Sequence, residues 1–107
     1  MKGTYTGDGK NYQYIPLDFA PVRVQVICET QSNTAIYNGT AFAGCPAQTS
    51  TYKASELTEE SILDGSKHHY VKVLISGSGF YVCYCASSSH ARTNAKGYAY
   101  HFTAERF

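Results

Sequence analysis

The chain has 107 residues and a formal net charge of +1, from nine lysines and arginines against eight aspartates and glutamates. This length fits one domain, 1–107, and the near-neutral charge excludes a strong general attraction to nucleic acid or acidic membranes. Hydrophobic residues make up 43%, which excludes a disordered chain, and no segment approaches the roughly 20 apolar residues of a membrane span. Ten tyrosines suit half-buried strands, although tyrosine is also common on contact surfaces.

The first segment predicts a hairpin. The stretch "TYTGDGKNYQYIP" puts Tyr5 and residues 12–15 in two strands, with Gly7-Asp8-Gly9 as the turn between them. The residues after Met1 are polar and do not form the apolar run of a signal peptide. A secreted protein would therefore be represented here by its mature form.

Residues 17–30, "LDFAPVRVQVICET", fit two structures. The alternation of "VRVQV" predicts a strand, whereas Asp18 as a cap and Pro21 in the first turn predict a helix. Local pattern does not choose between them.

Further turns divide the rest of the chain. Asn38-Gly39 is the favoured type I′ pair and predicts a second hairpin. A short strand around Tyr52 and an acidic loop follow. The segments 70–76 and 80–86 predict a central hairpin, and "YAYHF", 98–102, predicts a last strand. With one helix near the start, these elements make an α+β domain with an antiparallel sheet.

The cysteines favour a structural role over a metal site. Cys83 and Cys85 lie two apart in a strand and so share one sheet face. Each is better placed to meet Cys28 or Cys45 than its neighbour, and three pairings stay open beside buried thiols. Zinc sites usually join paired cysteines at wider spacing, so we predict no metal, and no motif predicts a cofactor.

Histidines supply the candidate acids and bases. His68 and His69 precede a predicted strand and could transfer protons, although the pattern favours a solvent-exposed turn. His90 lies with Arg92 and Lys96 in the one small basic cluster of the sequence, which could contact phosphate.

The order of the elements resembles the small secreted fungal guanyl-preferring ribonucleases. A helix at 17–30, the stretch "YKASEL", a glycine-containing loop and the hairpin "YVKVLISGSGFYVCYCASSS" carry the likeness over roughly residues 10–90. The resemblance implies one helix packed on a twisted antiparallel sheet, the microbial ribonuclease-like fold, in a single domain.

The resemblance also implies that the catalytic set is broken. Lys53 stands where the family has the glutamate general base after the tyrosine of the short strand, Tyr52. Lys72 falls near the phosphate-binding arginine, and Ser87 near the general-acid histidine. A charged lysine cannot accept the proton of a ribose hydroxyl, so we expect no catalytic residue and no enzymatic activity.

A ribonuclease-like scaffold without its chemistry is similar to the secreted effectors of powdery mildew and related plant-pathogenic fungi. This resemblance implies an avirulence or virulence protein that is secreted, acts as a monomer in the host cytoplasm, and suppresses plant immunity without membrane contact. Its implied partners are a host plant protein, such as an intracellular immune receptor, or host RNA. The expected binding residues are Tyr52, Lys53, Lys72, His90 and Arg92. The chain lacks the early and the terminal cysteine that many of these effectors share.

Two alternatives remain open at this level. One is an active small ribonuclease with a rearranged site built from His68 or His69, His90 and Glu56. The other is an unrelated secreted β-rich toxin or adhesion module. A strand at 17–30 would remove the basis of the ribonuclease analogy.

Overall fold

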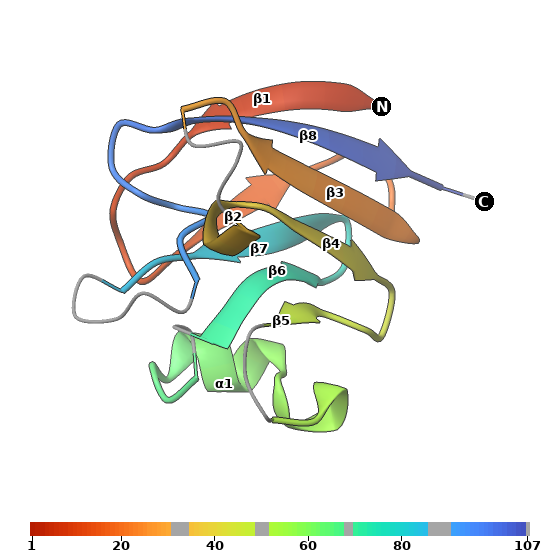
Figure 1. Ribbon diagram of the computed structural model, residues 1–107. Coiled ribbons are helices and arrows are strands. Elements are labelled where there is room, and N and C mark those ends of the chain that lie inside the picture. The colour runs from red at the N-terminus through yellow and green to blue at the C-terminus, as the bar shows by residue number, and fades with distance from the viewer. Residues whose placement is uncertain (31–34, 49–51, 68–69, 86–90, 107) are drawn as a thin grey trace.

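The molecule is built from two antiparallel sheets stacked face to face, with a short helix beneath the second sheet (Figure 1). The computed structural model describes residues 1–30, 35–48, 52–67, 70–85 and 91–106. Sheet A has the order β1 (Lys2–Thr6), β8 (Ala99–Glu105), β3 (Arg23–Cys28) and β4 (Gly39–Phe42). Sheet B has the order β2 (Tyr12–Pro16), β7 (Gly79–Cys83), β6 (Val71–Ile75) and β5 (Ala47–Gln48). The helical elements of the described residues are α1 (Glu59–Leu63) and the 3₁₀ turns η1 (Ala35–Tyr37) and η2 (Ala54–Glu56).

The predicted α+β class, with one helix at 17–30 on a single sheet, is wrong. That segment contains β3, which pairs with β8 on one side and with β4 on the other. Val24, Val26 and Cys28 are fully buried and the residues between them point outward. The period-two pattern of β-branched residues therefore outweighs the helix-capping signal. The ribonuclease resemblance takes its helix from this segment, so the fold that it implies is not the fold of this chain.

The first predicted hairpin is also wrong, although both of its strands exist. β1 belongs to sheet A and β2 to sheet B, so residues 7–11 cross from one sheet to the other. Asn94 holds this crossing: its buried side-chain amide donates to Asp8 Oδ1 (2.6 Å) and to the carbonyl of Lys10 (3.1 Å). A distant buried amide thus determines the path of a loop whose glycines alone suggest a tight turn.

The Asn38-Gly39 pair does not form the expected hairpin turn either. Residues 35–37 form the 3₁₀ turn η1, and β4 pairs with β3 instead. The Asn38 side-chain oxygen accepts the backbone N–H of Cys28 at 2.6 Å. This hydrogen bond fixes the return of the chain toward sheet A.

The central hairpin and the last strand are confirmed. β6 and β7 pair in antiparallel register, and Gly77 turns the chain between them with a φ of 56°, a value that favours glycine. β8 covers the predicted last strand and lies between β1 and β3. Two different patterns predict these strands: nearly continuous apolar runs predict β6 and β7, which are largely buried, and alternation predicts β8, whose residues alternate in burial.

The main core lies between the two sheets. Phe80 of sheet B packs edge-on against Phe102 and Tyr5 of sheet A, with ring centroids 5.1 and 6.5 Å apart. A second apolar cluster lies on the other side of sheet B, where Leu57 and Ile62 pack against β6 and β7. Every residue of β7 is therefore buried, and sheet B is the middle layer.

A capping box sets the start of α1. The Thr58 hydroxyl accepts the backbone N–H of Ser61, and the Ser61 hydroxyl accepts the backbone N–H of Thr58. Glu59 is consequently fixed as the first helical residue. Within the described ranges, no helix is long and apolar enough to cross a membrane.

Candidate binding surface

The residues expected to bind a partner do not form one surface. Tyr52 is half-buried and packs edge-on against Tyr70 at 5.1 Å, with the Lys67 ammonium 5.0 Å from the centre of its ring. Lys53 beside it is exposed and directly precedes η2. Both residues therefore lie with the helical segment under sheet B.

Lys72 lies elsewhere, on β6. It lines a hollow of about 390 Å³ together with the polar side chains of Gln25, Asn38 and Thr40. Burial lowers the pKa of its ammonium group. Of the ion pairs among the described residues, none involves Lys72.

Arg92 is brought near Lys72 through the backbone. Thr93, the next residue, donates its hydroxyl to the carbonyl of Lys72. The Arg92 guanidinium donates to the Tyr37 hydroxyl at 3.4 Å and lies 5.8 Å from the centre of the Tyr84 ring. The cations expected to bind a partner thus divide between two places, Lys53 in one and Lys72 with Arg92 in the other.

The candidate proton-transfer histidines, His68, His69 and His90, lie outside the described residues. Glu56, their expected partner in a rearranged ribonuclease site, is exposed at the end of η2. His101 lies on the outer side of sheet A, 3.2 Å from Glu29.

All four cysteines are present as thiols. Cys28 and Cys83 are buried, and burial raises the pKa of the Cys83 thiol well above its ordinary value. Cys45 is exposed and Cys85 is half-buried. Buried thiols were one of the two expected states, and no disulfide joins any candidate pair in this structure.

The structure assembles a surface that the sequence interpretation missed, on the outer side of sheet B. We call it the tyrosine face and define it as Tyr12, Tyr14, Ser76, Tyr81 and Glu59. The ring of Tyr81 is the centre: the Tyr14 ring lies 4.9 Å from it and the Tyr12 ring 5.8 Å from it, both inclined. Tyr14 is 39% exposed and Tyr81 only 7%. Two accessible rings are thus held on a buried third ring.

Glu59 ties the tyrosine face to α1. Its two carboxylate oxygens accept separate hydrogen bonds, from the Ser76 hydroxyl at 2.6 Å and from the Tyr81 hydroxyl at 3.0 Å. These bonds lower the pKa of the Glu59 carboxyl, so the group is anionic at neutral pH. Burial, with a contribution from Glu59, raises the pKa of Tyr81 to about 12. The face therefore presents a fixed negative charge among neutral phenols.

Gly79 makes room for the Tyr14 ring. A Cβ atom at this position would lie 2.5 Å from the Tyr14 ring end and 2.5 Å from the carbonyl oxygen of Ile15. The Tyr14 hydroxyl then reaches the carbonyl of Ser76 at 2.9 Å. A side chain on Gly79 would lift the ring off the sheet, so this glycine positions an exposed aromatic group.

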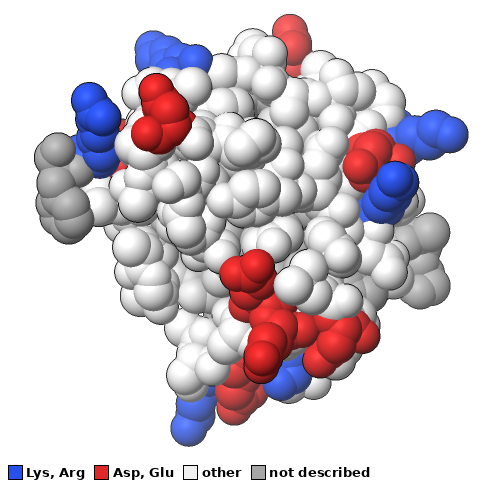
Figure 2. All heavy atoms as spheres, turned by 180° about the vertical axis from the view of Figure 1, so that it is seen from behind, with Lys and Arg blue, Asp and Glu red and all other residues white. Residues whose placement is uncertain are grey.

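The surroundings of Glu59 are acidic. The segment from 53 to 67 has four carboxylates and two lysines, and all four carboxylates are exposed: Glu56, Glu59, Glu60 and Asp64. Figure 2 shows acidic side chains gathered on the lower part of the molecule, where α1 lies in Figure 1. The tyrosine face thus adjoins a region of net negative charge although the whole chain is nearly neutral.

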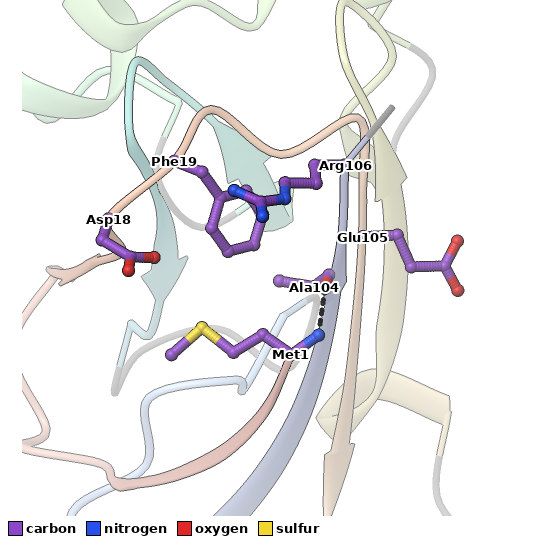
Figure 3. A pocket seen from close by; sticks show the side chains of 6 residues that line it. All are labelled: Met1, Asp18, Phe19, Ala104, Glu105 and Arg106. Atoms are coloured by element: carbon purple, nitrogen blue, oxygen red, sulfur yellow. Dashed lines mark hydrogen bonds between the residues drawn. The ribbon is translucent and has the colours of Figure 1, made fainter.

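Two hollows of about 480 Å³ differ in what surrounds them. The first lies beside the chain ends (Figure 3), where the Met1 ammonium donates to the carbonyl of Ala104 at 2.8 Å and Arg106 lies over Phe19. The second is a groove lined by residues 8 and 10–14. Because Tyr12 and Tyr14 line the groove, it continues the tyrosine face, and we take the two together as the candidate binding surface.

One signal could have indicated this surface. Tyr12 and Tyr14 are two apart in a predicted strand and so must share one face of a sheet. No pattern in the sequence predicts that Glu59 joins this surface, because its hydrogen bond with Tyr81 depends on how α1 packs against sheet B. Comparison with known proteins supplies no further guide: no protein family model, no curated protein and no solved structure matches the chain.

Proposed function

We propose that this chain is a non-enzymatic binding domain that recognises basic side chains of a partner protein through the tyrosine face. The observation that carries the proposal is the fixed geometry of an exposed phenol ring, Tyr14, and a half-buried one, Tyr12, beside an anchored carboxylate. Tyrosine offers a large contact area at low conformational cost. Rings already held by Tyr81 lose little further freedom on binding.

The chemistry of the face selects cations. A lysine or arginine side chain can lie over the Tyr14 ring, worth about 0.5–1 kcal/mol at an exposed site, while its charge pairs with Glu59. The two hydrogen bonds to Glu59 hold the carboxylate in one orientation, which favours a directed ion pair. The neighbouring acidic side chains add attraction at longer range, and this attraction weakens with salt.

The proposal keeps part of the expectation from sequence. Binding without catalysis is retained, and a partner protein is favoured over RNA because phosphates would meet the carboxylates of α1. The role of a secreted fungal effector in the host cytoplasm stays a prediction. An adhesion or toxin module would use the same kind of surface.

The test is selection from a random peptide library displayed on phage, with the intact chain as bait. We expect selected peptides to be rich in lysine and arginine. Their affinity should fall about tenfold or more for Glu59→Gln and for Tyr14→Ala. The matched control is Glu29→Gln, on the outer side of sheet A, which should leave the affinity unchanged.

Two results would contradict the proposal. One is a set of selected peptides whose affinity responds to neither Glu59→Gln nor Tyr14→Ala. The other is single-stranded RNA that binds the chain and displaces the peptides, with Lys72→Ala and Arg92→Ala weakening that binding. The second result would place the binding site at Lys72 and Arg92, as expected from the sequence.

A further inference from the structure

The backbone of β2 has an unused hydrogen-bonding side. β2 is the first strand in the order of sheet B, and of the described strands it pairs only with β7. Tyr84 donates its N–H to the carbonyl of Asn11, and Leu17 donates its N–H to the carbonyl of Ser78. These two bonds place the odd-numbered residues in the hydrogen-bonded positions toward β7. The alternation of an antiparallel ladder then directs the N–H and C=O of Tyr12 and Tyr14 away from β7.

These outward groups have no partner among the described residues. No hydrogen bond of the turns, loops or side chains there uses the backbone N–H or C=O of Tyr12 or Tyr14. The groove lined by residues 8 and 10–14 lies along this strand. Two donors and two acceptors thus border a hollow of about 480 Å³, and this is what an added strand requires.

The edge is also rigid before anything binds. The Gln13 side-chain amide donates to the carbonyl of Thr6 at 3.2 Å and to Asn94 Oδ1 at 3.0 Å. Asn94 in turn holds Asp8 and Lys10. The strand and the loop before it are therefore fixed by hydrogen bonds that mostly converge on the buried Asn94, which lowers the ordering cost of pairing.

We propose that an extended basic peptide binds antiparallel to β2 as a fifth strand of sheet B. This inference rests on the proposed function and adds its geometry. Peptide residues directly opposite Tyr12 and Tyr14 would direct their main-chain groups to β2 and their side chains to the tyrosine face. Pro16 has no N–H and ends the pairing. The recognised segment is accordingly short, with lysine or arginine at every second position.

Charge decides between a peptide and a second copy of the chain. Pairing of two β2 edges would bring two tyrosine faces together on the same side of the joined sheet. Each face carries Glu59 beside the exposed Glu60, so the two copies would oppose like charges, which is unfavourable. A basic strand meets the same groups with opposite charge.

The experiment uses the intact chain and the peptide Thr-Lys-Thr-Lys-Thr-Lys-Thr, capped at both ends. One matched version carries N-methyl groups on the three lysines and another carries them on the three threonines. Affinity is measured by calorimetry, and amide hydrogen exchange of the protein is followed by NMR. In the antiparallel register the lysine N–H groups point to β2, so lysine methylation should weaken binding about tenfold or more. Threonine methylation should leave the affinity unchanged.

Hydrogen exchange gives an independent reading. The amides of Tyr12 and Tyr14 should exchange at least about tenfold more slowly with the peptide bound, whereas those of Gln13 and Ile15 are already paired and should change little.

Strand addition alone would be overturned if the peptide bound at the tyrosine face with neither an effect of methylation on affinity nor protection of the amides from exchange. If only threonine methylation lowered the affinity, the antiparallel register that places the lysines opposite Tyr12 and Tyr14 would be wrong. Protection that grows with protein concentration in the absence of peptide would identify a second copy as the occupant. Failure of the unmodified peptide to bind would overturn the proposed function as well.

Discussion

The outer sides of the two sheets treat their charges differently. On sheet A, Arg23 and Glu105 face each other across paired strands and form an ion pair of 2.7 Å. On sheet B, the Glu59 carboxylate is held by two hydroxyl groups, and neither ion pair within the described part of the chain involves it. Hydroxyl groups fix the position of a carboxylate and leave its charge in place, whereas a guanidinium neutralises it. Sheet A thus compensates the charge of Glu105 within its own surface, whereas sheet B leaves the Glu59 carboxylate charged.

Loss of the contacts that hold the loop between the two sheets should give the largest effect on stability. Asn94→Ala removes the buried amide that holds residues 8–10 and the Gln13 side chain. We expect a loss of about 2–4 kcal/mol in the free energy of unfolding, because several buried polar groups lose their partners together. Urea denaturation measures this loss. Asn11→Ala, at an exposed asparagine in the same loop, is the control and should change stability by less than about 0.5 kcal/mol.

The next effect concerns the fit of the tyrosine face. Gly79→Ala places a methyl group against the carbonyl of Ile15 and the ring of Tyr14. We expect about 1–3 kcal/mol of destabilisation from overpacking, and weaker peptide binding because the Tyr14 ring is displaced. Thermal unfolding and the peptide titration measure the two effects. Ser78→Ala, at the exposed neighbour in the turn, should leave both unchanged, and equal losses in the two variants would contradict the role given to Gly79.

Removing one charge from each sheet would test directly whether the two surfaces use their charges differently. Glu105→Gln breaks the ion pair of sheet A and should cost no more than about 1 kcal/mol, without any change in peptide affinity. Glu59→Gln should have a small effect on stability and a large one on affinity. If the two variants lowered affinity equally, binding would depend on overall charge and the distinction between the sheets would fail.

The smallest effect is a dependence of stability on pH. The pKa of Glu59 is lowered in the folded chain by the bonds from Ser76 and Tyr81. The contribution of these bonds to stability is therefore present above the unfolded pKa of about 4.3 and is lost as the pH falls through the lowered value. Tyr81→Phe removes one bond, so its unfolding temperature should fall less steeply on acidification than that of the wild type. Equal slopes would contradict this account.

Local pattern predicted the parts of the fold that depend on neighbouring residues. Apolar runs identified β6 and β7, alternation identified β8, and Gly77 and Gly79 identified the turn. The pattern at 17–30 contained the correct strand, but a capping signal competed with it and no short-range property decided. The resemblance to ribonucleases favoured the helix, and the burial of Val24, Val26 and Cys28 shows why the strand wins.

The predictions that were wrong concern parts of the fold that depend on contacts between distant segments. The Asn94 side chain holds residues 8–10 where the chain crosses between the sheets. No feature of the sequence around Gly7-Asp8-Gly9 predicts this contact. The candidate site shows the same division. Tyr12 and Tyr14 could be assigned to one face from their spacing, whereas Glu59 joins them only through the packing of α1. The expected set joined Lys53 and Lys72, taken from the resemblance to a fold whose helix is absent, with Arg92 of the basic cluster. These residues lie in two separate places, Lys53 in one and Lys72 with Arg92 in the other.

The position of β8 has a consequence for how the chain acquires its structure. β8 lies between β1 and β3, with Lys2 opposite Thr103 and Arg23 opposite Glu105. Sheet A therefore cannot assemble until residues 99–105 have left the ribosome, and β1 must wait for a partner almost a full chain length away. Sheet B needs no segment after β7 for its own pairing. Long sequence separation slows folding because loops must close before contacts form. Sheet B can thus pair before sheet A is complete, and its inner face is fully covered only once β8 has joined sheet A.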